Sequence, residues 1–263
     1  MMNLGIIAAS HDRAGIKHVM DLGLGYAEFD VNADDVAYVT GNVDDIKAAL
    51  SEYDVKIGAV GRWGRFRIND DGSFNKKEQQ DEFDLIDFCR KVGCPVYICG
   101  VNYVDGLSYY SNITAAINYI KSLMDYAGSD VKICTYNCDW YSYIDKPHEW
   151  DIVHDHLKGL GIKFDPSHSI NGGRDYLSEM AHYGDKFYHI HLKGTINIDG
   201  QRFDDPPAGL DTVNWGAFLS ILRKFHYDGM LSIEPHSETW QGELGDKGVR
   251  YTIDYFRKML FEA

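Results

Sequence analysis

Eight short apolar runs that alternate with helical segments constrain the fold of this chain more than any other feature. The strand-like runs lie at 4–9, 25–31, 55–60, 95–100, 131–135, 161–165, 187–192 and 229–234. Apolar residues at three- and four-residue spacing predict helices between them, at 75–92, 108–127 and 246–261 among others. Strands separated by helices pair in parallel, because parallel neighbours need a crossover connection. Eight such units close a barrel. We therefore predict an α/β fold, a single (β/α)8 TIM barrel.

The length of the chain fits one such barrel. It has 263 residues, and single α/β barrels have about 250. No Pro- or Ser-rich linker divides it, so we expect one domain over residues 1–263. The main alternative is an open doubly wound sheet, which more often carries a Gly-rich phosphate loop after its first strand; residues 8–12 form no such loop. A long irregular stretch, 194–213, follows the seventh strand, on the side where barrel loops build active sites.

The charge of the chain disfavours two classes of partner. Its net charge is −14, and an acidic surface repels nucleic-acid phosphates and anionic lipids. No run approaches the roughly 18 apolar residues of a membrane-spanning helix, and the N-terminus lacks the features of a signal peptide. The five cysteines are odd in number. Together these features predict a protein of the reducing cytoplasm.

Three polar residues stand where strand-like runs of the second half end. They are Asp165, His191 and Glu234. Because the carboxyl ends of barrel strands converge on one pocket, these side chains are expected to be neighbours. Two carboxylates and an imidazole suit Mn²⁺, Co²⁺ or Zn²⁺ better than Ca²⁺, and Mg²⁺ stays open. We predict a divalent metal site; the alternative is three separate rim residues, each satisfied by its neighbours.

The sequences around these residues resemble a known family. Phe164-Asp165-Pro166-Ser167-His168, His189-Ile190-His191-Leu192-Lys193 and Ser232-Ile233-Glu234-Pro235-His236 are similar to motifs of the xylose-isomerase-like TIM barrels. That superfamily includes sugar-phosphate isomerases and epimerases, ketose 3-epimerases, inosose dehydratases and nucleases of the endonuclease-IV type (AP endonuclease family 2). The resemblance follows the strand order of the whole chain and is most specific from 131 to 240. It implies four metal ligands, from strands five to eight.

One of the implied ligands is missing. Asp165, His191 and Glu234 match the last three, but Tyr136 stands where the family carries a fifth-strand Glu. A phenol whose pKa is near 10 is a poor ligand for a divalent ion, so Asp139 or a water is left as the fourth donor. We place Tyr136 and the retained Asn137 among the substrate-binding residues. A reaction with one base and one acid, such as a dehydration, survives this change more easily than a symmetric two-base epimerisation.

The resemblance also implies roles for residues around the ion. Glu234 would transfer the proton, His168 would serve acid–base chemistry or hold a substrate hydroxyl, and Arg202 would bind a substrate oxygen. Glu28, at the end of the second strand, is expected to contact substrate or to form a structural salt bridge. Trp63 would give a flat wall for a sugar ring, or would pack its own loop.

Two further features have competing interpretations. Arg62, Arg65 and Arg67 follow the third strand and would bind a phosphate or carboxylate, or else lie in water. His189 has the same side-chain parity as His191, and we expect it to be a buried core residue one layer deeper.

These features predict a metal-dependent isomerase or epimerase of a sugar, keto-sugar or sugar phosphate. The reaction would be proton transfer next to a metal-polarised carbonyl. The alternative is a lyase or dehydratase on a keto-sugar or inosose-like polyol. A metal-free sugar-binding barrel and an endonuclease-IV-like nuclease are less favoured. The expected partner is a small-molecule carbohydrate, without nucleic acid or membrane, and a homo-oligomer is left open.

Overall fold

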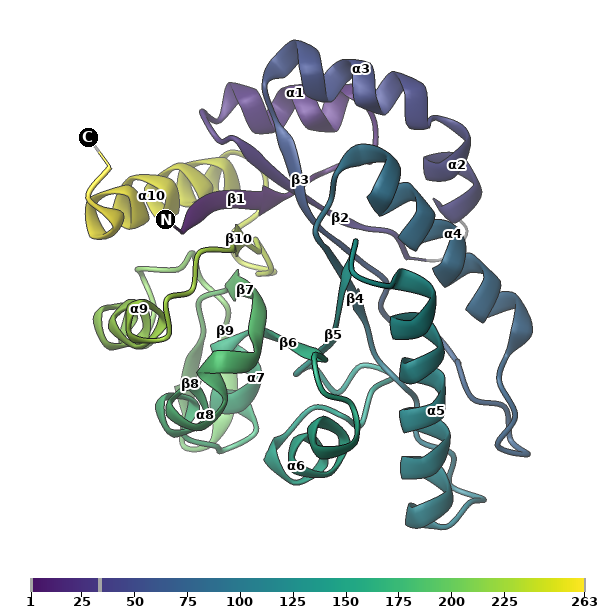
Figure 1. Cartoon of the computed structure of the whole chain (residues 1–263). Coiled ribbons are helices and arrows are strands. Elements are labelled where there is room, and N and C mark those ends of the chain that lie inside the picture. Colours follow the sequence, from purple (N-terminus) through teal and green to yellow (C-terminus); the bar gives the residue numbers. More distant parts are fainter. Residues whose placement is uncertain (1, 33–34, 263) are drawn as a thin grey trace.

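Eight parallel strands close into a barrel. The computed structural model of the chain, shown in Figure 1, describes residues 2–32 and 35–262. Around the barrel the strands follow the order β1-β10-β7-β6-β5-β4-β3-β2. Their bounds are β1 (Asn3–Ile7), β2 (Tyr26–Asp30), β3 (Lys56–Gly61), β4 (Val96–Cys99), β5 (Lys132–Tyr136), β6 (Gly161–Phe164), β7 (Phe187–Leu192) and β10 (Met230–Ile233). The closed order confirms the (β/α)8 barrel and excludes the open sheet.

Helices surround the barrel and connect its strands (Figure 1). They are α1 (Arg13–Asp21), α2 (Asp35–Gly41), α3 (Val43–Tyr53), α4 (Lys76–Val92), α5 (Tyr109–Ala127), α6 (Pro147–His156), α7 (Pro166–Asn171), α8 (Tyr176–Tyr183), the 3-10 turn η1 (Gly184–Lys186), α9 (Trp215–Lys224) and α10 (Gly242–Leu260). The helices predicted from periodicity correspond to α4, α5 and α10. Side-chain caps explain two of the starts, because Asn75 accepts from the backbone N–H of Glu78 and Ser108 from that of Ser111.

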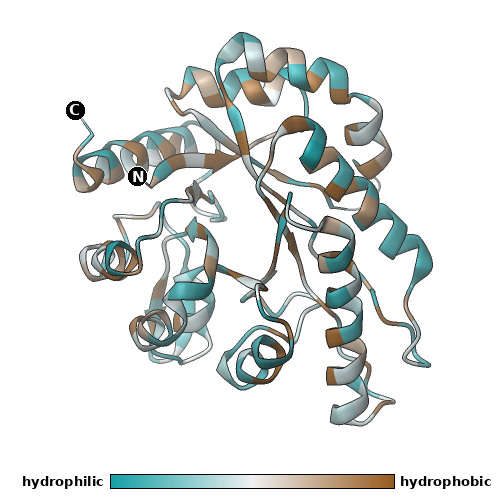
Figure 2. Ribbon diagram, in the orientation of Figure 1, coloured by the Kyte–Doolittle hydropathy of each residue, from teal (hydrophilic) through white to brown (hydrophobic). Residues whose placement is uncertain are grey.

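The barrel strands are largely buried because they are covered on both faces. Every residue of β4, β6 and β10 is buried, as parallel strands beneath a helical layer require. Hydrophobic residues run along the barrel strands and alternate with hydrophilic ones on the helices (Figure 2). Between barrel and helices, Phe164 stacks on Phe187 with ring centroids 4.6 Å apart. None of the described helices is long and apolar enough to cross a membrane.

The inner face of the barrel, in contrast, carries polar side chains. In the strand register Tyr136 of β5 pairs with Lys163 of β6, and Lys163 pairs with His189 of β7. Ser232 of β10 pairs with His191. Because alternate residues of a strand share a face, Lys163 and His189 lie one layer below Asp165 and His191, and Tyr136 lies at the same level as Lys163.

The stretch after the seventh strand is more regular than predicted. Residues 194–213 contain an antiparallel hairpin, β8 (Ile196–Ile198) and β9 (Gln201–Asp204). Asp199 and Gly200 both have positive φ values, 54° and 78°. This is the conformation that a two-residue hairpin turn of the Asp-Gly type needs. The loop is therefore a built structure beside the mouth of the barrel.

Candidate metal and substrate site

The three predicted metal ligands converge. Asp165 follows β6, His191 lies in β7 and Glu234 follows β10, and one ligand atom from each lies within 4.8 Å of the others. The three strands are neighbours in the barrel order, which is why residues far apart along the chain meet. We refer to Asp165, His191 and Glu234 as the candidate metal site.

Asp165 offers one free oxygen to this site. The residue is fully buried, and its Oδ1 accepts the backbone N–H of Ser167 at 2.8 Å, which caps α7. Its Oδ2 has no hydrogen-bond partner. The nearest charged or titratable nitrogens are His168 Nε2 at 3.3 Å and Lys163 Nζ at 3.9 Å. A buried carboxylate oxygen without a donor is costly unless something else satisfies it, so it fits a cation ligand.

His191 lies between two carboxylates. Its Nδ1 is 2.5 Å from Glu234 Oε2, and its Nε2 is 2.9 Å from Glu28 Oε1. Burial alone would lower the pKa of His191, but the charge of Glu28 and the hydrogen bonds with both carboxylates raise it to about 9. Without a metal the ring is therefore protonated and donates to both. With a metal, Nδ1 would become the ligand and Glu28 would fix the ring through Nε2.

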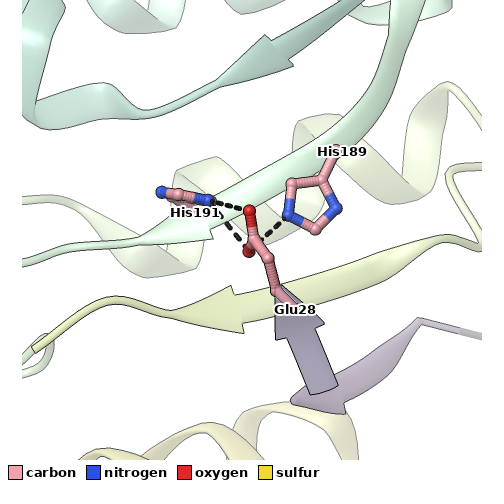
Figure 3. A group of neighbouring side chains, drawn as sticks. All are labelled: Glu28, His189 and His191. Atoms are coloured by element: carbon pink, nitrogen blue, oxygen red, sulfur yellow. Dashed lines mark hydrogen bonds and ion pairs between the residues drawn. The ribbon is translucent and has the colours of Figure 1, made fainter. Parts of the chain in front are cut away.

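Glu28 has a different place from the substrate contact expected of it. It is fully buried, and its carboxylate joins His189 Nε2 at 2.8 Å to His191 (Figure 3). Burial would raise the pKa of Glu28, but the two imidazoles hold it well below its ordinary value. The geometry thus replaces the expected substrate contact with the alternative, a structural ion pair. His189 is fully buried, as predicted for a core histidine.

Tyr136 does not supply the missing ligand. Its hydroxyl donates to the backbone oxygen of Trp140 at 2.9 Å, and burial raises its pKa further above the ordinary value. The ring stacks on Trp63 with centroids 5.5 Å apart. It also lies against Gly100, where an added Cβ would be 2.4 Å from the phenol. A protonated phenol engaged with the backbone is not available to a metal ion.

Asn137 holds the backbone of a metal ligand. Its side-chain nitrogen donates to the Asp165 carbonyl at 2.8 Å, and its side-chain oxygen accepts the Asp165 N–H at 2.9 Å. Only 1% of Asn137 is exposed. This two-way bond positions Asp165, and it takes the place of the direct substrate contact expected of Asn137.

The site opens into a polar pocket of about 550 Å³, a volume within the range of ligand pockets. The residues that line it include five of the predicted site residues, namely Trp63, His168, His191, Arg202 and Glu234. Burial lowers the pKa of His168 to about 4, so its ring is neutral at pH 7. Arg202 is half-exposed and its guanidinium lies 2.7 Å from Asp205. These residues therefore face the same space.

Two lysines of the pocket were missed by the sequence analysis. Lys163 is 1% exposed, and its Nζ is 3.9 Å from Asp165 Oδ2. Lys193 is also buried, with its Nζ 3.4 Å from Glu234 Oε1 and 3.6 Å from Asp205 Oδ2. A signal was present, because Lys163 interrupts the apolar run of β6 at the parity of Asp165. Lys193 comes two residues after His191, just past the end of β7, and has the same side-chain parity.

The arginines after β3 are neutralised within their own part of the chain. Arg62 pairs with Glu78 and Asp81, Arg65 pairs with Glu78, and Arg67 pairs with Glu82. Arg62 and Arg67 are fully buried. These contacts anchor the loop to α4 and do not form the anion site that was one interpretation of the cluster.

Comparison with solved structures shows the same fold in sugar epimerases. The 3-keto-D-glucoside 4-epimerase YcjR from E. coli has a TM-score of 0.76 and 14% identity, covering 98% of this chain and all of its own. The D-psicose 3-epimerase from Clostridium cellulolyticum H10, solved with D-tagatose, has a TM-score of 0.77 and 13% identity, covering 98% and 99%. The IOLI protein with a bound zinc atom has a TM-score of 0.73 and 14% identity, covering 98% and 97%. At these identities the likeness shows the fold alone.

A comparison with family profiles gives the assignment. No curated protein matches the chain by sequence. The profile of the family described as "Xylose isomerase-like TIM barrel" matches residues 16–259, nearly the whole chain. That range contains every barrel strand except β1. It also contains the three candidate metal ligands and the loop that carries Arg202. The chain therefore belongs to the xylose isomerase-like TIM-barrel family.

Proposed function

We propose that the chain is a metal-dependent isomerase or epimerase that acts on a sugar or keto-sugar. The observation that carries this proposal is the convergence of Asp165, His191 and Glu234 at the mouth of a barrel of this family. A sugar phosphate is a less favoured substrate than the sequence alone indicated, because the arginines after β3 are already paired with carboxylates. The activities for which the similar epimerases are named support the same substrate class.

The candidate metal site would supply three of the four ligands that the family resemblance implies for a divalent ion. Asp165 Oδ2, His191 Nδ1 and a Glu234 oxygen are the donors that would hold it. Two carboxylates and one imidazole favour Mn²⁺, Co²⁺ or Zn²⁺, with Mg²⁺ as a further candidate. The fourth position would be open to water or substrate, since Tyr136 is engaged elsewhere. When bound, such an ion polarises a substrate carbonyl and makes the neighbouring C–H more acidic.

The residues of the pocket would divide the remaining work. Glu234 would take and return the proton, and Lys193 Nζ lies 3.4 Å from its Oε1. His168, neutral at pH 7, would hold or transfer a hydroxyl proton. Trp63 would cover one face of the sugar ring, and Arg202, at the exposed edge, would bind a substrate oxygen.

Dehydration of a keto-sugar or inosose-like polyol is a second candidate reaction. It is favoured by Tyr136, which stands where the family resemblance implies a carboxylate opposite Glu234 and whose hydroxyl is engaged with the backbone oxygen of Trp140. A dehydration needs one base and one acid, and Glu234 with His168 would supply them. A metal-free sugar-binding barrel and a nuclease are weaker candidates, the latter because of the net charge of −14.

Metal analysis and NMR in D₂O together test the proposed function. Metal-replete protein is expected to carry a stoichiometric transition metal that Asp165→Ala and Glu234→Ala reduce. With a panel of ketoses and inososes, isomerisation or epimerisation would place deuterium at the carbon next to the carbonyl. Dehydration would instead release a deoxy product. Protein that binds no metal under replete conditions would exclude the proposed chemistry.

The partner and location of the protein remain proposals beside this function. A small carbohydrate is the proposed partner, and self-association is left to measurement. The five cysteines are all unpaired, which supports the proposed cytoplasmic location because thiols persist in reducing compartments.

A further inference from the structure

Lys163 changes the charge of the candidate metal site. In the strand register its partner on β5 is Tyr136, the residue that stands where the family resemblance implies a glutamate. The chain thus has an uncharged phenol in place of one expected carboxylate, and an ammonium on the next strand. Both residues make the local charge more positive than a carboxylate at position 136 would.

The carboxylates of the site already have cations beside them. Lys163 Nζ lies 3.9 Å from Asp165 Oδ2, the oxygen that has no hydrogen-bond partner. Lys193 Nζ lies 3.4 Å from Glu234 Oε1. Two ammonium groups therefore face two carboxylates. A divalent ion held by the same carboxylates would add positive charge to a site that is balanced without it.

The ammonium of Lys163 is held beside Asp165 by its burial. Its side chain is 2% exposed, and its ammonium lies 6.0 Å from the centroid of the Trp63 ring. The stem passes through the inner layer of the barrel beside Tyr136 and His189. Moving a buried ammonium away from its carboxylate is costly, because the interior screens charge poorly. An ion at Asp165 and the Lys163 ammonium would thus be close neighbours of the same sign.

We propose that Lys163 is a built-in counter-ion of Asp165, which competes with the divalent ion and keeps the metal affinity of the site low. This inference rests on the proposed metal site. It assigns to Lys163 a positioning and charge-balancing role for Asp165, a role not implied by the family motifs. Removing the ammonium while keeping the side-chain volume should therefore tighten metal binding.

Calorimetric titration with Mn²⁺ at pH 7 tests the inference without any substrate. The variants are Lys163→Met, which replaces the ammonium with an apolar group of similar length, and Lys163→Gln, which keeps a polar end without charge. We expect the Kd for Mn²⁺ to fall at least tenfold in both. Lys47→Met is the matched control, because Lys47 is an exposed residue of α3. It removes the same net charge and is expected to leave the Kd unchanged.

The outcomes separate this inference from the proposed function. Equal Kd values in the wild type, Lys163→Met and Lys163→Gln would overturn the role of Lys163 and leave the metal site standing. An equal gain in Lys47→Met would also overturn it, because the effect would then come from net charge. Absence of Mn²⁺ binding from all four proteins would overturn both proposals. Circular dichroism melts show which variants are folded, and Lys163→Gln carries the test if the Met variant is not.

Discussion

At the scale of single residues, His191 connects the site to the interior of the barrel. One nitrogen faces Glu234 at the pocket and the other faces Glu28, which also binds His189. A carboxylate behind a metal-binding histidine fixes the ring and its tautomer. Glu28 would therefore act on a bound metal through His191, from a buried position outside the residues that line the pocket.

The variant Glu28→Gln tests this connection. The amide keeps the size of the side chain but loses the charge that holds His191, so we expect the Mn²⁺ affinity to fall about 10- to 100-fold. The pKa of His191, followed by NMR of the ring protons without metal, should drop below its value of about 9, because Glu28 is a principal cause of the increase. An unchanged pKa and an unchanged affinity would contradict the proposed role.

The sequence predicts which residues belong to the site better than it predicts their hydrogen-bond partners. Asp165, His191 and Glu234 are found by one rule, because the ends of neighbouring parallel strands converge. Glu28 and His189 are 161 positions apart, and their contact depends on where β2 and β7 point across the barrel. Parity gives the face of a strand but neither the depth of a side chain nor its partner. For the same reason Asn137 was expected to face substrate, whereas it binds the backbone of Asp165.

At the scale of elements, a buried ion pair attaches the loop after β3 to α4. Arg67 Nε lies 2.6 Å from Glu82 Oε1, and both side chains are fully buried. Tyr119 of α5 donates its hydroxyl to the other Glu82 oxygen at 2.9 Å. The loop, α4 and α5 are thus joined through one carboxylate.

Removal of Arg67 and removal of Arg65 should have unequal effects on the stability of the fold. Arg67→Met leaves Glu82 buried without its cation, and we expect the free energy of unfolding to fall by about 3–5 kcal/mol. Arg65→Met removes a partly exposed partner of Glu78, which keeps Arg62, and should cost less than about 1 kcal/mol. Urea denaturation of the two variants measures both. If Arg67→Met lowered the free energy of unfolding as little as Arg65→Met, the Arg67–Glu82 pair would not stabilise the loop.

A histidine of α6 makes stability depend on pH. Burial, with the charge of Lys186, lowers the pKa of His154 from 6.5 to about 4. As the pH falls from 6.5 to about 4, His154 becomes protonated in the unfolded chain but stays neutral in the folded protein, so the free energy of unfolding decreases. The shift corresponds to at most about 3 kcal/mol. His154→Gln should flatten the fall in unfolding free energy between pH 6.5 and 4. A remainder is expected from the other histidines whose pKa burial lowers, namely His168, to about 4, and His11 and His189. An unchanged pH profile would exclude His154 as a cause.

The hairpin β8–β9 shows where element prediction fails. The eight barrel strands are buried and therefore read as apolar runs. The residues of β9 are mostly exposed, so the sequence Gln201-Arg202-Phe203-Asp204 has no apolar run to find. The Asp199-Gly200 pair was the available signal, since it favours a two-residue turn.

At the scale of the whole molecule, closure of the barrel brings the candidate site together. Its ligands come from β6, β7 and β10, which are adjacent only in the folded sheet. The repeat of eight strands was enough to predict this closure, because it depends on the number and order of units. The prediction of a single domain over residues 1–263 fits this closed sheet and stays a prediction.

Metal binding should therefore stabilise the whole barrel. The unfolded chain does not hold Asp165, His191 and Glu234 within 4.8 Å of one another, so an ion binds the folded state preferentially. At a Mn²⁺ concentration 100 times its Kd, the free energy of unfolding should rise by about 2.7 kcal/mol. Thermal unfolding with and without Mn²⁺ measures the gain. Asp165→Ala is expected to lose it, whereas Asp139→Ala, a change of the same type at an exposed residue of the pocket, should keep it. A gain that survives in Asp165→Ala would place the ion elsewhere, and loss of the gain in Asp139→Ala instead would identify Asp139 as the donor that replaces the fifth-strand glutamate.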